Sequence, residues 1–242
     1  MAQQNAGNRT PNLSCRDCPT LRAAQWRVLT QAEVERLDRA KRTAAYSPGE
    51  PLFQQNSPCE GIHCFASGSV ALRKTDGHGN SVLINLISEG STIGYRCYYN
   101  SQHHAEEAEV LEPSTICLVP NNVLGELLAA NPSLGEVFSQ QMAKDLREME
   151  QALLESVTLP VRGRVARLLR LLMDRFGEAN ETGEIVLRLP FGRQEMAELL
   201  GIQRETVTRT LNALQSDGVL AHTGRTLIVE DLDRLLDELE AE

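Results

Sequence analysis

The chain has 242 residues, enough for two modest domains that each bury a core of their own. Its formal net charge is -9 at pH 7, so the overall charge cannot attract the chain to a nucleic acid. Any binding to a nucleic acid must depend on positive charge gathered locally. No apolar run could span a membrane and residues 1–12 lack a secretory signal, so we expect a cytoplasmic protein without a membrane partner.

Residues 1–25 form a polar arm that holds the sequence Cys15-Arg-Asp-Cys18-Pro19. Six cysteines in a cytoplasmic chain do not favour structural disulfides, so the thiols need another explanation. Two cysteines separated by two residues are found in zinc sites, redox pairs and iron–sulfur sites, and also as exposed thiols on a flexible arm. The arm is therefore a candidate metal or redox segment whose chemistry the spacing alone leaves open.

Residues 26–125 are rich in glycine and in short β patterns. Apolar segments 70–72 and 82–87 flank the turn sequence 76–80, which predicts a hairpin, and the whole region predicts a β-roll or barrel. Within it, Cys64 falls in the middle of a strand, where a cysteine is most often a small packing residue. The pair His103-His104 is expected in a solvated loop.

Residues 126–158 predict one long helix with Pro132 near its start. Its apolar residues recur at three- and four-residue steps, which is typical of a two-helix contact between two copies of a chain. The alternative is that this stripe covers the β domain. The stripe consists of Leu134, Phe138, Met142, Leu146, Met149 and Leu153.

Residues 159–242 begin with a helix after Pro160 and continue into a helix-turn-helix. The spacing Ala197-x3-Gly201-x5-Val207 supplies a small residue where two helices cross, a glycine for the left-handed turn and a branched apolar residue for packing. Turns at 217–218 and 223–225 then predict a two-stranded wing.

The second helix of this motif has a polar face suited to the major groove. We expect Arg204, Glu205, Thr208 and Arg209 to contact base edges in a palindromic DNA site. Arg193 and Arg225 are expected to contact phosphates. Much of the acid lies in the C-terminal tail, whereas the stretch from Arg162 to Arg225 carries its positive charge as arginine. The chain has no phosphate loop, nucleophile elbow or zinc-protease motif, so we expect no enzyme activity.

The order of these parts resembles the CRP/FNR transcription regulators over nearly the whole chain. Gly68-Ser69-Val70, Gly90 and Gly94 are similar to that family's β-roll, and Gln203 to Arg209 is very similar to its recognition helix. The resemblance implies an α+β protein with a cyclic-nucleotide-binding-like β-roll, a long dimerisation helix and a C-terminal winged helix-turn-helix. It also implies a homodimer that binds double-stranded DNA and contacts RNA polymerase.

The effector implied by the resemblance is not cAMP. Cyclic-nucleotide members have a glutamate after the β-roll glycine and an arginine further on, whereas here Tyr95 follows Gly94 and the segment 103–107 has no arginine. Glu106 and Glu107 would repel a cyclic phosphate, and no residue replaces the charge-assisted contact of an arginine.

The cysteines resemble those of the FNR subgroup, which holds an oxygen-labile 4Fe-4S cluster. The resemblance assigns ligand roles to Cys15, Cys18 and Cys117, but Ala24 stands where the subgroup has a third arm cysteine. We take Cys97 as the fourth ligand, with Cys59 and Cys64 as alternatives. The predicted function is redox-responsive or oxygen-responsive DNA binding. A thiol–disulfide switch, a zinc site or a haem sensor using a histidine remain the other interpretations; the candidate histidines are His63, His78, His103 and His104.

Overall fold

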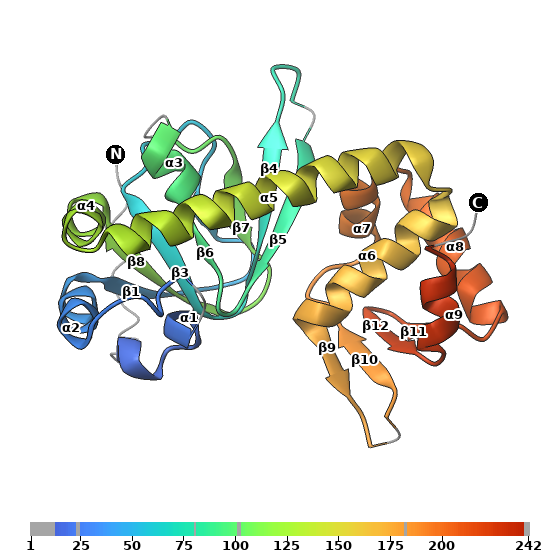
Figure 1. Ribbon diagram of the computed structural model, residues 1–242. Helices are drawn as coiled ribbons and strands as arrows, with labels where there is room; N and C mark the ends of the chain where they lie inside the picture. Colours follow the sequence, from blue (N-terminus) through green and yellow to red (C-terminus); the bar gives the residue numbers. More distant parts are fainter. Residues whose placement is uncertain (1–12, 23–24, 80, 101–102, 182, 240–242) are drawn as a thin grey trace. The chain divides into compact units, whose positions relative to one another are not determined.

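The computed structural model describes residues 13–22, 25–79, 81–100, 103–181 and 183–239. The chain divides into two compact units, Met1–Asp145 and Leu146–Glu242, so the boundary falls inside a long helix (Figure 1). The sequence had placed a boundary near residue 125, before that helix. Among the described residues, no helix has the length and apolarity needed to cross a membrane.

Two antiparallel four-stranded sheets form the N-terminal unit, as the predicted β-roll requires. One sheet has the strand order β1-β8-β3-β6 and the other has the order β2-β7-β4-β5. The predicted hairpin is confirmed as β4 and β5. The strands are β1 (Arg42–Tyr46), β2 (Pro51–Phe53), β3 (Gly61–Ser67), β4 (Ser69–Thr75), β5 (Ser81–Ser88), β6 (Thr92–Ile93), β7 (Glu107–Val110) and β8 (Ser114–Pro120).

Alternation along β3 and β8 separates two apolar cores, because successive side chains of a strand point to opposite faces. Phe65 and Ile116 belong to a core formed mostly by strand residues of both sheets. Cys64, which precedes Phe65, and Cys117, which follows Ile116, belong to the other core, which includes residues of the arm and the helices. The strand pattern therefore points both cysteines toward the N-terminal segment.

Short helices cover that second core. They are the 3-10 helix η1 (Cys15–Asp17), α1 (Pro19–Arg22), α2 (Gln31–Ala40), α3 (Tyr95–Asn100) and α4 (Asn121–Ala130). The sequence analysis missed α2, although its start carries a capping box: the Thr30 side chain accepts from the Glu33 N–H, and the Glu33 carboxylate accepts from the Thr30 N–H. Val34 and Leu37 form its buried face.

The long helix α5 runs from Pro132 to Thr158 rather than from residue 126. Asn131 has the extended conformation φ -131°, ψ 90°, since a residue that precedes proline is driven out of the helical region. The expected single helix is therefore broken into α4 and α5 at this residue.

Trp26 holds the arm against the start of α5. Its indole N–H donates to Oγ1 of Thr92 at 2.9 Å, and its ring meets the Phe138 ring edge-on at a centroid distance of 5.8 Å. The Phe138 ring also stacks on Tyr95, whose hydroxyl donates to the Asp145 carboxylate. The arm, α3 and the first half of α5 therefore form one packed group.

The C-terminal unit is a winged helix-turn-helix, as predicted. Its elements after α5 are α6 (Val161–Phe176), β9 (Gly177–Ala179), β10 (Ile185–Arg188), α7 (Arg193–Leu200), α8 (Arg204–Ser216), β11 (Leu220–Thr223), β12 (Thr226–Val229) and α9 (Leu232–Asp237). Gly201 ends α7 in the left-handed region at φ 61°, which is the turn that the glycine predicted. The strand order β11-β12-β10-β9 extends the wing into a four-stranded sheet, of which β9 and β10 were not anticipated.

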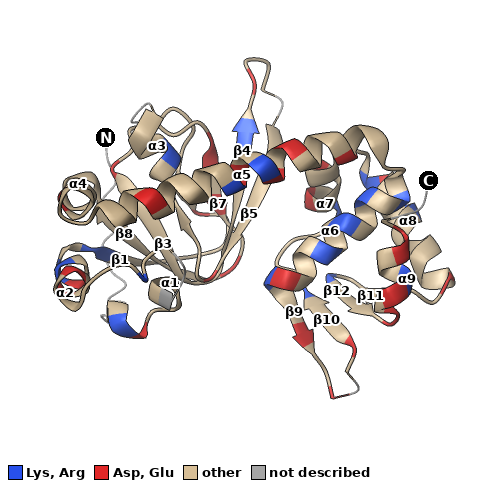
Figure 2. Cartoon of the chain, viewed as in Figure 1, with Lys and Arg blue, Asp and Glu red and all other residues tan. Residues whose placement is uncertain are grey.

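Arg162, at the start of α6, binds two acidic groups from the C-terminal part of this unit. Its guanidinium lies 2.7 Å from a carboxylate oxygen of Asp217 and 2.7 Å from one of Glu238. Figure 2 shows arginines along α6 and acidic residues in α9. Part of the acidic tail is therefore paired with arginine inside the unit.

The apolar stripe of α5 changes character along the helix. Leu134 and Phe138 are fully buried in the N-terminal unit, whereas Leu146, Met149 and Leu153 leave 58%, 57% and 69% of their surface exposed. Val157 continues the exposed stripe. The first half of the stripe therefore covers the β-roll, and the second half is left open for the contact between two copies of the chain that the sequence predicts.

We expect Met149→Asp to weaken association between two copies of the chain. Two carboxylates would face each other across an apolar seam, so the dimer dissociation constant should rise at least about tenfold. Sedimentation measures the change, and Gln151→Asp on the opposite side of the helix is the control. The unsubstituted chain should be largely dimeric at micromolar concentration even without a cofactor, and a monomer there would contradict the seam.

Candidate functional site

The polar face of α8 is open to solvent. Val207, Leu211 and Leu214 are buried beneath the helix, which leaves the opposite face free. An open groove on that face is lined by Arg204, Glu205, Thr208, Arg209 and Asn212. The structure therefore brings together the four residues predicted to contact bases and adds Asn212, which the sequence analysis had not singled out.

The side chains of this face remain available for an external partner. The Thr208 hydroxyl donates to the Arg204 carbonyl oxygen at 3.0 Å, so its methyl group is left for an apolar contact. Within the part of the chain that the structure describes, Glu205 and Arg209 form no ion pair with each other or with a third residue. Their charges are thus not neutralised before a ligand arrives.

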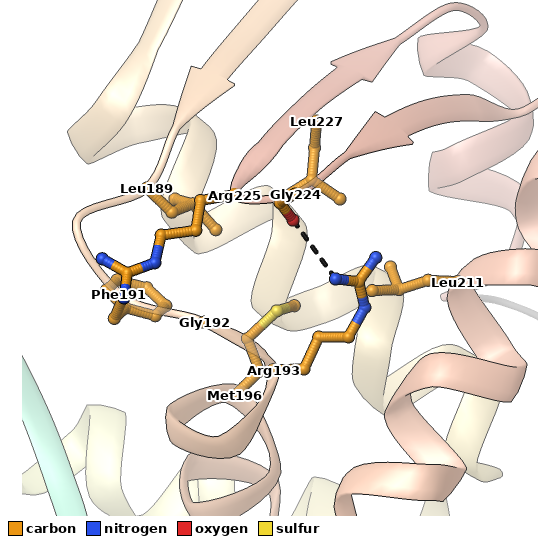
Figure 3. Close-up of a pocket in the computed structure, with 9 residues that line it drawn as sticks. All are labelled: Leu189, Phe191, Gly192, Arg193, Met196, Leu211, Gly224, Arg225 and Leu227. Carbon is orange, nitrogen blue, oxygen red and sulfur yellow. Dashed lines mark hydrogen bonds between the residues drawn. The ribbon is translucent and has the colours of Figure 1, made fainter.

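The two arginines predicted to contact phosphates flank a tiny cavity of about 10 Å³ between the start of α7 and the wing (Figure 3). That volume holds about one water molecule, so the cavity is no ligand site. Arg225 is exposed, and its guanidinium donates to the Pro190 carbonyl oxygen at 3.0 Å. Arg193 is half-buried and donates to the Gly224 carbonyl oxygen at 3.2 Å. Both side chains therefore also fix the wing.

Arg193 continues into a chain of polar contacts that reaches α8. Its guanidinium lies 2.8 Å from Nδ1 of His222, and Nε2 of His222 lies 3.0 Å from Oδ1 of Asn212. Burial and the neighbouring Arg193 charge lower the pKa of His222, which favours the neutral ring that this chain of contacts needs. Arg193 is thereby a positioning residue for the recognition helix.

A second candidate site is a group of four buried cysteines in the N-terminal unit. Cys64 of β3 and Cys117 of β8 are directly opposite each other in the antiparallel register. Cys15 and Cys18 of the arm lie close enough to Cys64 to interact with it electrostatically, and Cys18 does the same with Cys117. All four are buried thiols, so the arm does not present exposed cysteines.

A buried lysine accompanies these thiols. Nζ of Lys41 lies 3.3 Å from Sγ of Cys15 and 2.7 Å from a carboxylate oxygen of Asp38. Burial alone would lower the pKa of Lys41, but the Asp38 hydrogen bond and the Cys15 thiol raise it above its usual value, so the ammonium is retained. Asp38 also accepts from the backbone N–H of Cys15 at 2.9 Å. No sequence motif had pointed to this pair.

Burial keeps the thiols of Cys15, Cys64 and Cys117 protonated in the absence of a metal. It raises the pKa of Cys15 to about 12 against the opposing effect of Lys41, and it raises the pKa of Cys64 and Cys117 as well. A bound metal reverses this, because a coordinating thiol is deprotonated by the metal charge.

Cys97, which the sequence suggested as the fourth ligand, does not join this four-cysteine group. Its thiol interacts with Cys59, and these two sulfurs and a ring nitrogen of His104 lie within 4.8 Å of one another. The reason is Gly94, whose left-handed φ of 96° starts α3 against the beginning of β3. A Cβ at Gly94 would stand 2.8 Å from the Gly61 carbonyl oxygen.

The expectation of a solvated His103-His104 pair is wrong for His104. Only 3% of His104 is exposed, and its ring stacks on Phe53 at a centroid distance of 3.7 Å. Burial lowers the pKa of His104 to about 4, so its ring is neutral at pH 7. His103 is exposed, as expected.

The segment expected to repel a cyclic phosphate carries an internal ion pair. The Arg96 guanidinium lies 2.7 Å from a carboxylate oxygen of Glu106. Glu106 is therefore paired with an arginine that lies outside the segment 103–107, so the repulsion expected from Glu106 is reduced.

A β-roll joined through a long helix to a winged helix-turn-helix with an exposed recognition face defines a DNA-binding transcription regulator with an N-terminal β-roll domain. A family model of the cyclic nucleotide-binding domain matches residues 43–131, and one of the Crp-like helix-turn-helix domain matches residues 163–238. The chain belongs to the CRP/FNR family of transcription regulators, and members of this family are not enzymes.

Relatives of known name are similar over nearly the full length. The electron transport regulator A of Shewanella oneidensis is 24% identical over 220 residues, 90% of this chain and 87% of the relative. The fumarate and nitrate reduction regulatory protein of Escherichia coli K12 is 24% identical over 224 residues, 92% of this chain and 89% of the relative. Among solved structures, FixK2 from Bradyrhizobium japonicum has the same fold, with a TM-score of 0.75 at 22% identity over 84% of this chain and 98% of that one.

Proposed function

We propose that this regulator senses oxygen or redox state through a 4Fe-4S cluster held by Cys15, Cys18, Cys64 and Cys117. The observation that carries the proposal is that Cys15 of the arm shares one buried core with Cys64 and Cys117 of two paired strands, while Cys18 lies within electrostatic range of both strand thiols. A cubane cluster takes about four thiolates. This group offers four, although position 24 of the arm is an alanine and cannot be a ligand.

The proposed ligand set replaces Cys97 by Cys64. In β3, Ile62 and Cys64 share the face toward the arm and the helices, so Cys64 is no more remote from the arm than Cys117 is. Cys59 and Cys97 are engaged with each other and with His104. The residue that the sequence suggested as packing thus becomes the best candidate for the fourth ligand.

The surroundings of the four thiols fit a charged cluster. Cysteine-ligated clusters carry net negative charge, and a charge buried away from water needs an opposite charge beside it. Lys41 supplies that charge 3.3 Å from Cys15, and its side chain is only 2% exposed. The cluster, when bound, supplies an oxygen-sensitive redox group.

The residues of the chain connect this site to α5. The arm that carries Cys15 and Cys18 ends at Trp26, and Trp26 packs on Phe138 of α5. A second contact fixes the arm to β3, since the Thr20 hydroxyl donates to the Phe65 carbonyl oxygen at 2.7 Å. We propose that release of the two arm cysteines loosens Trp26 from Phe138 and changes how two α5 helices pair, which sets the spacing of the recognition helices.

The names of the relatives support this reading of the signal. One relative is the anaerobic regulatory protein of Pasteurella multocida, and others are named for fumarate and nitrate reduction. At 23–24% identity they support the class of signal and not the ligand set.

For DNA recognition, we propose that Arg209 contacts guanine, Glu205 accepts from cytosine and the Thr208 methyl contacts thymine. Arg204 lies on the same face. Arg193 and Arg225 contact phosphates while they hold the wing. Contact with RNA polymerase and a palindromic site are further parts of the proposal.

We expect Arg209→Ala and Arg225→Ala to weaken DNA binding in different ways. Arg209→Ala should cost about 1–3 kcal/mol on a palindrome with TGA half-sites and little on scrambled DNA, because it removes a base contact. Arg225→Ala should weaken both duplexes equally and reduce the salt slope by about one unit. Fluorescence anisotropy over a salt series measures both. Equal losses on the two duplexes for Arg209→Ala would reduce its role to a phosphate contact.

We expect Cys15→Ala, Cys18→Ala, Cys64→Ala and Cys117→Ala each to remove most of the iron from anaerobically purified protein. Each change deletes one ligand of the proposed cluster. Cys59→Ala and Cys97→Ala are the matched controls and should retain iron. Iron and sulfide assays with visible spectra provide the measurement, and circular dichroism verifies that each variant is folded.

Two outcomes would separate the parts of this proposal. Loss of iron in Cys97→Ala with retention in Cys64→Ala would overturn the ligand set and leave the cluster. Colourless unsubstituted protein whose DNA binding is indifferent to air would overturn the cluster itself, and the DNA-binding assignments would stand.

We expect Lys41→Met to shorten the lifetime of the chromophore in air several-fold. The substitution keeps the length of the side chain but removes the positive charge beside Cys15. Lys41→Arg restores the charge and should recover most of the lifetime. Visible absorbance after controlled addition of oxygen follows the decay. Equal lifetimes for the Met and Arg variants would show that the charge has no part in protecting the cluster.

A further inference from the structure

The group formed by Cys59, Cys97 and His104 is separate from the proposed cluster ligands and takes no part in DNA binding. Two sulfurs and one imidazole nitrogen lie within 4.8 Å of one another, and all three side chains are buried. They come from three segments, namely the loop before β3, helix α3 and the loop before β7. Such convergence of soft ligands is unusual for side chains that only pack.

The chemistry of the three groups fits zinc. Zinc binds thiolates at about 2.3 Å and imidazole at about 2.0–2.1 Å, which places tetrahedral ligand atoms roughly 3.5–4 Å apart. The present separations of up to 4.8 Å are only slightly wider and close by small side-chain rotations. The set contains no carboxylate, which disfavours magnesium and calcium.

The charge balance suits a buried position. Binding converts two thiols to thiolates, forms two zinc–sulfur bonds and one zinc–nitrogen bond, and releases two protons to solvent. The two thiolates cancel the double charge of zinc, and the imidazole binds in its neutral form. No uncompensated charge is left away from water.

The backbone that carries the ligands is already fixed. The His104 N–H donates to the Ser57 carbonyl oxygen at 2.9 Å, and the His104 carbonyl oxygen accepts from the Asn56 N–H at 2.7 Å. The Cys59 carbonyl oxygen accepts from Nδ2 of Asn121 at 2.6 Å. Stacking on Phe53 restricts the His104 ring. A metal would therefore meet ligands that lose little further freedom.

We infer that Cys59, Cys97 and His104 bind one zinc ion, with a fourth coordination position taken by a ligand from solution. The ion would tie α3 to the loops before β3 and β7. Because Tyr95 of α3 stacks on Phe138 and bonds to Asp145, this tie would also hold the packing of α5 in the N-terminal unit.

The test measures zinc and iron in the same preparations of the full-length chain. Elemental analysis should give roughly one zinc per chain, and absorption fine structure at the zinc edge should show both sulfur and nitrogen neighbours at the distances above. Cys59→Ser, Cys97→Ser and His104→Gln should each lose most of the zinc and retain iron. His103→Gln, a change of the exposed neighbour, is the matched control and should retain both metals.

The iron-site variants make the two sites distinguishable. Cys64→Ser and Cys117→Ser should lose iron and keep zinc, and circular dichroism identifies any variant that has not folded. Zinc that is lost in Cys64→Ser but kept in Cys59→Ser would lie among the arm cysteines and would overturn this inference. Zinc-free protein with a Cys59–Cys97 disulfide found by mass spectrometry would overturn it as well. The iron measurements would be unaffected by the presence or absence of that disulfide.

Discussion

The burial of Trp26 is the contact on which the N-terminal unit depends. The indole is 1% exposed, and its N–H is satisfied by Thr92, so the largest side chain of the region carries no unpaired polar group into the core. Loss of a side chain of this size from a core typically costs about 3–5 kcal/mol. Two hydrogen bonds act with this anchor, from the Thr20 hydroxyl to the Phe65 carbonyl oxygen and from the Cys15 N–H to Asp38. The positions of the two arm thiols thus follow from one large aromatic contact and these two hydrogen bonds.

The strand register supplies the other half of that site. Antiparallel pairing of β3 with β8 sets Cys64 opposite Cys117, and a slip of either strand by one residue would point the thiol of that strand into the core between the sheets. The same alternation places Phe65 and Ile116 in that core. The packing that keeps the roll together therefore also keeps the two strand thiols aimed at the arm.

Local sequence patterns predicted the C-terminal unit well because its motif is local. Ala197, Gly201 and Val207 fix the crossing of α7 and α8, and all three lie in the short segment 197–207, so spacing alone carries the geometry. The capping box at Thr30 and Glu33 was an equally local signal and could have revealed α2.

The cysteine sites could not be read in the same way, since they depend on contacts far apart in sequence. Cys64 and Cys117 meet only through strand pairing, and Lys41 reaches Cys15 across 26 residues. A cysteine in the middle of a strand has the same sequence pattern whether it packs in the core or binds a metal. His104 was assigned to a solvated loop because its neighbours are polar, whereas its burial is set by Phe53 from β2.

The paired acids at Arg162 affect how binding measurements on this protein should be interpreted. Asp217 follows directly on the recognition helix, so its pairing with Arg162 couples the end of α8 to α6, and Glu238 adds the C-terminal segment. Added salt screens these partly exposed pairs as well as contacts with phosphate. The slope of binding affinity against salt concentration then contains an intramolecular contribution whenever DNA binding changes these pairs. A count of displaced counterions taken from that slope equals the number of phosphates that the protein touches only if the pairs are the same in the free and the bound chain.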